Sequence, residues 1–173
     1  PRPVRPGEEL PAAALEAHLR ARVPALAAAP GPLAIEQFPG GYSNLTYLLR
    51  FGTAGPEYVL RRAPAGAAAK GGHDMAREHR VLTALRAAGY ALAPEPLWLD
   101  EDPALLGAPF FLMARVQGVV LRAQPPKGAD LPAPTLRALS HAFADALAQL
   151  HALDVRAPSL AALGRPEGYV RRQ

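Results

Sequence analysis

The sequence contains no cysteine, and this absence excludes disulfides, thiolate-bound metals and cysteine nucleophiles. Long hydrophobic runs are also missing. No stretch of about 18 uninterrupted apolar residues occurs, so no membrane span and no membrane partner are predicted. Residues 1–9 lack the charged-then-apolar order of a signal peptide. We therefore expect a cytoplasmic protein.

Blocks of lysine and arginine are absent as well. The formal net charge is +4, from 19 Lys and Arg against 15 Asp and Glu. Such an excess can favour phosphate-bearing partners, but a nucleic-acid-binding face needs basic side chains clustered in one place. A modestly basic surface explains the charge more simply. We expect no nucleic acid partner, and a nucleic-acid-binding domain remains the weakest alternative because only charge supports it.

Two short ligand-binding motifs are missing too. A P-loop needs Gly-Lys followed by Ser or Thr, yet Lys70 and Lys127 follow alanine and proline. Histidines at a zinc-binding spacing such as His-Glu-x-x-His do not occur, and no metal ligands are assigned. These absences exclude a phosphate-binding turn of the P-loop type and a zinc site of the His-Glu-x-x-His type.

What is present is a mixture of strand-like and helical stretches. Hydrophobic spacing predicts helices over residues 10–23, 73–88 and 135–153. The strand-like runs cover residues 33–38, 45–51, 57–62, 97–99 and 109–116. Short Gly/Pro joints between the first three runs predict antiparallel pairing, and we expect a five-stranded meander with one helix after the third strand. This order predicts an α+β fold, because it differs from the strict alternation of a parallel sheet.

The first candidate binding feature is a glycine-containing turn, residues 39–46 (PGGYSNLT). Gly40 and Gly41 allow the backbone to fold tightly, with N–H groups free to point at phosphate. Ser43 and Asn44 add side-chain donors. The alternative is an ordinary hairpin turn, which the turn alone does not exclude.

The second feature is a cation on the third strand. Side chains alternate along a strand, so Val59 and Arg61 share one face. An apolar residue followed by a cation suits adenine followed by phosphate, and arginine can grip phosphate oxygens with two hydrogen bonds. Arg62 faces the other way and is the second choice. The alternative is that Arg61 is a strand-end arginine in water.

The third feature is Glu78, which lies at the centre of an apolar stripe on the helix predicted over 73–88. The stripe consists of Met75, Val81, Leu82 and Leu85. A carboxylate in such a stripe is unfavourable unless a cation pairs with it, and Arg61 is the candidate partner. The alternative is a stripe at the domain edge, with Glu78 reaching water. In kinases a cation and a glutamate placed in this way hold the nucleotide phosphates.

Four segments together resemble the aminoglycoside phosphotransferase family, namely GGYSNLTYLL, YVLRR, DMAREHRVLTAL and LGAPFFLMARVQG. The resemblance extends over Ile35–Gln173 and is strongest to the branch of kinase-like domains found alone or fused to acyl-CoA dehydrogenases. It implies a protein-kinase-like N-lobe with a five-stranded antiparallel sheet and one helix, followed by the first helices of a helical C-lobe. The implied parts are an N-terminal helix and linker (1–32), the nucleotide-binding N-lobe (33–117), and the hinge with the beginning of the C-lobe (118–173).

The resemblance also implies an adenine pocket. Met113 matches the residue at the back of that pocket, and Val59 would cover the base. The C=O of Ala114 and the N–H of Val116 would hydrogen-bond adenine. The family usually has acidic residues near positions 114 and 117, whereas this chain has Ala114 and Gln117.

The chain departs from the family where the catalytic loop is expected. That loop reads His-Gly-Asp followed by an asparagine, with a later aspartate for magnesium, and nothing here matches it. Asn44 is the only asparagine in the chain. No catalytic residue and no magnesium ligand are therefore assigned, and this segment alone is expected to be inactive.

The function that the resemblance implies is an ATP-dependent phosphotransferase that passes the γ-phosphate from ATP–Mg to a hydroxyl of a small molecule. The residues expected to bind the nucleotide are Gly40, Gly41, Ser43, Asn44, Val59, Arg61, Glu78, Met113, Ala114 and Val116. The alternative is a non-catalytic nucleotide-binding or interaction module. We expect an apolar face covered by a partner or by a second copy of the chain, which would give a homodimer.

Overall fold

The computed structural model describes residues 1–40, 44–64, 73–121, 131–164, 168 and 171. Two compact units are present. The first unit comprises Pro1–Thr83 and Pro94–Arg115, and the second comprises Ala84–Ala93 and Val116–Gln173. Within the described ranges, no helix combines the length and apolar character needed to cross a membrane.

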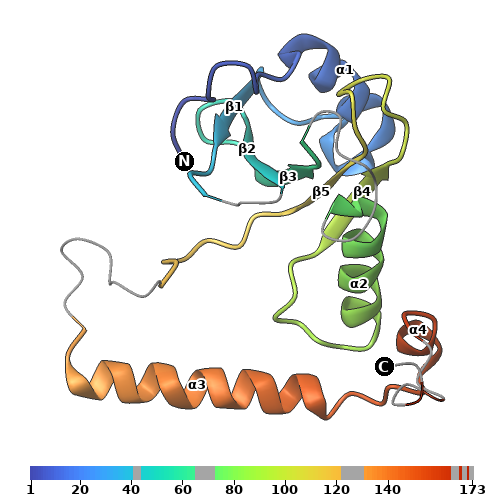
Figure 1. The fold of residues 1–173 in the computed structure, drawn as a ribbon. Helices are drawn as coiled ribbons and strands as arrows, with labels where there is room; N and C mark the ends of the chain where they lie inside the picture. Colours follow the sequence, from blue (N-terminus) through green and yellow to red (C-terminus); the bar gives the residue numbers. More distant parts are fainter. Residues whose placement is uncertain (41–43, 65–72, 122–130, 165–167, 169–170, 172–173) are drawn as a thin grey trace. The chain divides into compact units, whose positions relative to one another are not determined.

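A five-stranded antiparallel sheet forms the centre of the first unit (Figure 1). Its strands are β1 (Leu33–Gln37), β2 (Leu45–Phe51), β3 (Glu57–Arg62), β4 (Pro96–Asp100) and β5 (Phe110–Ala114). One helix, α2 (Met75–Ala87), follows β3. The α+β class and the antiparallel N-lobe architecture that the sequence predicts are confirmed.

The expected meander is wrong for the last two strands, because the order in the sheet is β1-β2-β3-β5-β4. β5 pairs with β3, and β4 occupies the edge. Phe110, Phe111 and Leu112 of β5 are fully buried, which suits a strand with neighbours on both sides. β4 begins with Pro96, which has no N–H to donate, and most of its residues are half-buried, as expected of an edge strand.

The main core lies between one face of the sheet and the N-terminal helix α1 (Ala12–Arg22) with the short helix η1 (Pro24–Leu26). Leu15, Leu19 and Leu26 have no exposed surface. They belong to one cluster with Tyr47, Leu49, Phe51, Leu60, Phe110 and Leu112 from the strands. Burying each such leucine contributes about 1.5–3 kcal/mol, so α1 is part of the folding unit and not an appendage.

Two glycines bring the loop before β1 against the loop after β2. Gly31 and Gly52 both have left-handed backbone conformations, with φ of +69° and +71°. A Cβ atom added to Gly31 would lie 2.8 Å from the Cα of Gly52, and one added to Gly52 would lie 2.8 Å from the carbonyl oxygen of Pro30. Backbone therefore meets backbone here, and no side chain fits between the loops.

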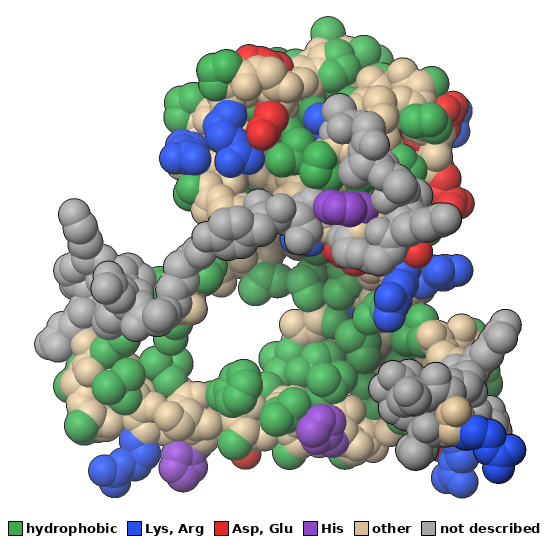
Figure 2. Space-filling model, viewed as in Figure 1, with side chains coloured by type: hydrophobic (Ala, Val, Ile, Leu, Met, Phe, Trp, Pro, Cys, Tyr) green, Lys and Arg blue, Asp and Glu red, His purple; other side chains and the backbone are tan. Residues whose placement is uncertain are grey.

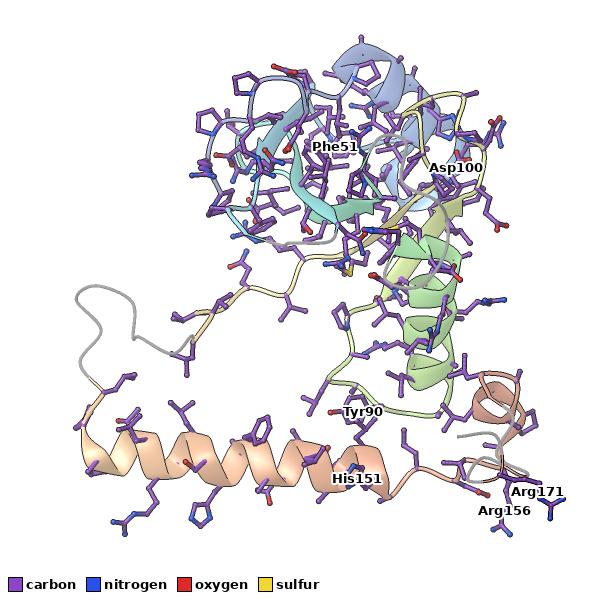
Figure 3. The ribbon with its side chains drawn as sticks, viewed as in Figure 1. Phe51, Tyr90, Asp100, His151, Arg156 and Arg171 are labelled. Carbon is purple, nitrogen blue, oxygen red and sulfur yellow. The ribbon has the colours of Figure 1, made fainter. Side chains whose placement is uncertain are left out.

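The second unit contains helices α3 (Ala133–His151) and α4 (Pro158–Ala161). Tyr90 lies against α3 (Figure 3), and its hydroxyl donates a 3.1 Å hydrogen bond to the carbonyl of Ala146. None of the described residues of α3 is fully buried. Its exposed apolar side chains form a stripe, visible in Figure 2, of Leu136, Leu139, Phe143 and Leu147.

Arg20 fastens the turn after α1 to the core. Its Nε donates to Glu16 Oε1 at 2.9 Å, and its two terminal nitrogens donate to the carbonyls of Ala29 and Gly31 at 2.7 and 2.6 Å. The guanidinium carbon also lies 5.1 Å from the centre of the Phe51 ring, within cation–π range. The other oxygen of Glu16 accepts the N–H of Leu33 at 2.9 Å. Both donors hold the pKa of Glu16 below its usual value, and the N–H of Leu33 has the larger effect.

We expect Arg20→Ala to lower the free energy of unfolding of the first unit by about 2–3 kcal/mol, because it removes hydrogen bonds from a charged donor and a cation–π contact. Arg22→Ala is the matched control. This exposed arginine lies on the same helix, and its loss should change stability by less than about 0.5 kcal/mol. Urea unfolding followed by the fluorescence of Trp98, the single tryptophan, reports on the first unit. Equal effects of the two substitutions would contradict the role of Arg20.

Candidate functional site

The sheet face opposite α1 carries an open pocket of about 420 Å³ within the first unit. Strand alternation places Arg61 of β3 on this face, together with Phe111 and Met113 of β5. The apolar lining comprises Val81, Leu82, Pro94, Phe111 and Met113. The charged lining comprises Arg61, Asp74, Arg77 and Glu78. The pocket therefore joins an apolar surface to a mixed-charge edge, as a ligand with an apolar ring and an anionic group would require.

Arg61 and Glu78 form the ion pair that the sequence predicts. Arg61 Nε donates to Glu78 Oε2 at 2.9 Å, and Nη2 lies 3.4 Å from Oε1. Both side chains are about one-third exposed, at 30% and 34%. Arg61 Nη1 also lies 3.4 Å from the hydroxyl of Thr46, its cross-strand neighbour on β2. The pair stands at the pocket edge, where solvent or a ligand can reach it.

Asn44, the residue just before β2, joins the same cluster. Its Nδ2 donates to Glu78 Oε1 at 2.8 Å, and its Oδ1 lies 3.0 Å from His73 Nδ1. The side chain is almost completely buried, with 4% of the residue exposed. The sequence assigned Asn44 to phosphate, but it did not indicate that Asn44 contacts Glu78 and His73.

Helix α2 begins at Met75, two residues later than predicted, because Asp74 caps it. The Asp74 Oδ1 accepts the backbone N–H of Arg77 at 2.8 Å. An aspartate directly before an apolar helical run is a recognised start signal, so the sequence could have revealed this residue. Asp74 also lines the pocket, although it is not among the residues that the sequence predicts to bind the nucleotide.

The structure places the predicted adenine residues in different ways. Met113 of β5 lines the pocket. Val59 pairs with it from the neighbouring strand β3, and 8% of the surface of Val59 is exposed. The N–H of Ala114 donates to the carbonyl of Glu95 at 2.8 Å. Val116 belongs to the second unit and is 68% exposed. Its binding role, like that of the others, remains a prediction.

The glycine turn is only partly described. Gly40 has a φ of +119°, a conformation that glycine adopts readily. The hairpin is closed by the hydrogen bond from the N–H of Phe38 to the carbonyl of Thr46, at 3.0 Å. The predicted residues Gly41 and Ser43 lie outside the described residues.

Arg62, the second choice for the strand cation, lies on the opposite face as strand alternation predicts. Only 7% of it is exposed, and its Nη1 donates to the carbonyl of Leu106 at 2.5 Å. This bond supports the loop before β5 and leaves Arg62 on the core side of the sheet. Arg61 is therefore the β3 cation that the pocket presents.

His79 packs against Phe111, which is one of the residues that line the pocket. Its ring meets that of Phe111 edge to face, with centroids 6.0 Å apart. Burial disfavours the charged imidazolium and lowers the pKa of His79 below its ordinary value of 6.5. Among the residues that the structure describes, no three His, Cys, Asp or Glu side chains are grouped closely enough to hold a metal ion.

Comparison with known proteins gives consistent matches. The model of the phosphotransferase enzyme family matches residues 34–173. The chain is 39% identical to acyl-CoA dehydrogenase family member 11 of Gallus gallus over 83% of its length, and 34% identical to family member 10 of Mus musculus over 99%. It spans 18% and 15% of the length of these two relatives.

A solved structure also matches. It is that of a Ralstonia eutropha protein assigned as an aminoglycoside phosphotransferase, with a TM-score of 0.70 and 31% identity. The match covers 95% of this chain and 45% of that protein. At this identity the likeness concerns sequence as well as fold.

We expect His79 to make the stability of the first unit depend on pH. Because its pKa is lower in the folded state, the unfolded chain takes up the proton first as the pH falls below about 6.5. The free energy of unfolding should therefore decrease from pH 7.5 towards pH 5. His79→Phe keeps a ring against Phe111 without a titrating group and should flatten this decrease in Trp98-monitored urea unfolding. His141→Gln, an exposed control on α3, should leave the slope unchanged; equal slopes for wild type and His79→Phe would contradict the prediction.

Proposed function

The chain belongs to the phosphotransferase enzyme family, and from this premise we propose that it is the nucleotide-binding part of an ATP-dependent small-molecule kinase. The observation that carries the proposal is the Arg61–Glu78 pair, placed where the apolar pocket meets its charged edge. Phosphoryl transfer relies on positioning and on charge stabilisation, and a strand cation held by a helix glutamate provides both for nucleotide phosphates.

Arg61 would contact the phosphates of ATP. Glu78 neutralises part of its charge and fixes its direction, while the guanidinium keeps further N–H groups for phosphate oxygens. The pair is one-third exposed, so a phosphate can approach it without large rearrangement. The turn residues Gly40, Gly41, Ser43 and Asn44 would cover the phosphates through their backbone N–H groups.

The adenine base would lie on the apolar part of the same sheet face. Met113 would form the back of the base site, and Val59 would cover the ring. The carbonyl of Ala114 and the N–H of Val116 would supply the two hydrogen bonds to the base. The N–H of Ala114 donates to the carbonyl of Glu95, so this N–H is not the group for the base.

Magnesium would accompany ATP and shield its phosphates. Among the described residues, the charged pocket lining offers two carboxylates, Asp74 and Glu78. Both accept hydrogen bonds, Asp74 from the helix start and Glu78 from Arg61 and Asn44. These residues do not form a set suited to Mg²⁺, so we place no metal ligand among them.

The reaction proposed for the whole enzyme is transfer of the γ-phosphate to a hydroxyl of a small molecule. The sequence has no His-Gly-Asp loop for the catalytic base. We therefore infer that the 173 residues bind ATP without turning it over. A non-catalytic nucleotide-binding module remains the second candidate, since a pocket that holds a nucleotide does not by itself transfer phosphate.

We expect Glu78→Gln to raise the dissociation constant for ATP by about tenfold, which corresponds to about 1.4 kcal/mol, because the neutral amide no longer holds Arg61 by charge. Titration calorimetry with ATP and Mg²⁺ measures the change. Affinity for adenosine should stay close to that of the wild type, since adenosine has no phosphate for Arg61.

Arg80→Gln is the matched control, because Arg80 is an exposed residue on the same helix. Its ATP affinity should equal that of the wild type. Unchanged ATP affinity in Glu78→Gln would contradict the role of the pair. Absence of ATP binding in the wild type would contradict the proposed nucleotide site.

A further inference from the structure

We propose that Asn44 and His73 are positioning residues that fix the orientation of Glu78, and through it Arg61, for nucleotide binding. The proposal rests on the proposed function and assigns to these two side chains a role that acts through other residues. Its basis is a hydrogen-bonded chain that runs from His73 through Asn44 to Glu78 and on to Arg61.

The donors and acceptors of this chain follow from elementary chemistry. The carboxylate that pairs with Arg61 is ionised and can only accept hydrogen bonds. Asn44 must therefore turn its NH₂ group towards Glu78, which leaves its carbonyl oxygen facing His73. Because that oxygen can only accept, His73 must carry a hydrogen on Nδ1 and donate it. Each contact thus has one allowed direction.

The two oxygens of Glu78 have different partners. Oε2 accepts Arg61 Nε at 2.9 Å, and Oε1 accepts Asn44 Nδ2 at 2.8 Å. The second Arg61 contact, from Nη2 to Oε1, is longer at 3.4 Å and holds the carboxylate only weakly. Asn44 therefore supplies the second fixed point that stops the carboxylate group from rotating away from Arg61.

Burial makes this arrangement specific. Only 4% of Asn44 is exposed, so an amide orientation without hydrogen-bond partners would leave buried polar atoms unsatisfied. Glu78 removes one of the two orientations, because its carboxylate requires the amide NH₂ group, and the amide oxygen then accepts the Nδ1–H of His73. The link also joins residues far apart in sequence, the residue just before β2 and the segment just before α2.

Substitutions at His73 separate positioning from a general structural role. In His73→Asn, a side-chain N–H can occupy nearly the place of Nδ1, so ATP affinity should stay within about twofold of the wild type. His73→Phe keeps a ring but has no donor, and its dissociation constant for ATP should rise about fivefold, as expected for one neutral hydrogen bond. Asn44→Ala removes a hydrogen bond to a charged group and should raise the dissociation constant for ATP tenfold or more.

The single asparagine offers a direct spectroscopic readout. Selective ¹⁵N labelling of asparagine gives one side-chain amide pair, that of Asn44, in the NMR spectrum of the wild type. In nucleotide-free protein, His73→Phe and Glu78→Gln should each shift this signal, and the control Arg80→Gln should not.

The outcomes are decisive in both directions. An Asn44 signal unmoved by His73→Phe, or equal ATP affinities of His73→Phe and His73→Asn, would overturn the proposal. If the wild type binds no ATP, the proposed function fails. The hydrogen-bonded chain is still tested by the NMR signal, which is measured without nucleotide.

Discussion

The sidedness of β3 is the constraint on which the rest of the first unit depends. This strand lies inside the sheet, and its side chains alternate between two environments. Leu60 and Arg62 face the core side, where α1 packs. Arg61 lines the pocket on the opposite face, and Val59 shares that face by strand alternation. A shift of one residue in register would bury Arg61 in the apolar core and remove Leu60 from it. Core and site therefore share one backbone register.

Much of this arrangement could be predicted from the sequence because it depends on local periodicity. The strand period placed Arg61 and Arg62 on opposite faces, and the helix period placed Glu78 towards Arg61. Periodicity says nothing about which strands are neighbours, so it gave no reason to expect β5 beside β3. The contacts of Asn44 depend on side-chain directions across three segments of the chain, and no spacing in the sequence encodes them.

The choice of arginine at position 61 has a geometric basis. Its planar group reaches Glu78 on α2 and Thr46 on β2 from one fixed orientation. A lysine ammonium carries the same charge but concentrates it at one point, and its single nitrogen cannot contact both neighbours from the positions that the separate guanidinium nitrogens occupy. The planar guanidinium of Arg61 thus connects helix α2, strand β2 and the charged edge of the pocket.

The contact between Gly31 and Gly52 limits how this domain can change during evolution. Where two loops touch through their backbones, neither glycine can gain a side chain without moving the loops apart. A change at one position cannot be compensated by a smaller residue at the other, since both already have the smallest. Variation in side chains must therefore fall elsewhere in the chain, so positions 31 and 52 should stay glycine among relatives that have otherwise diverged.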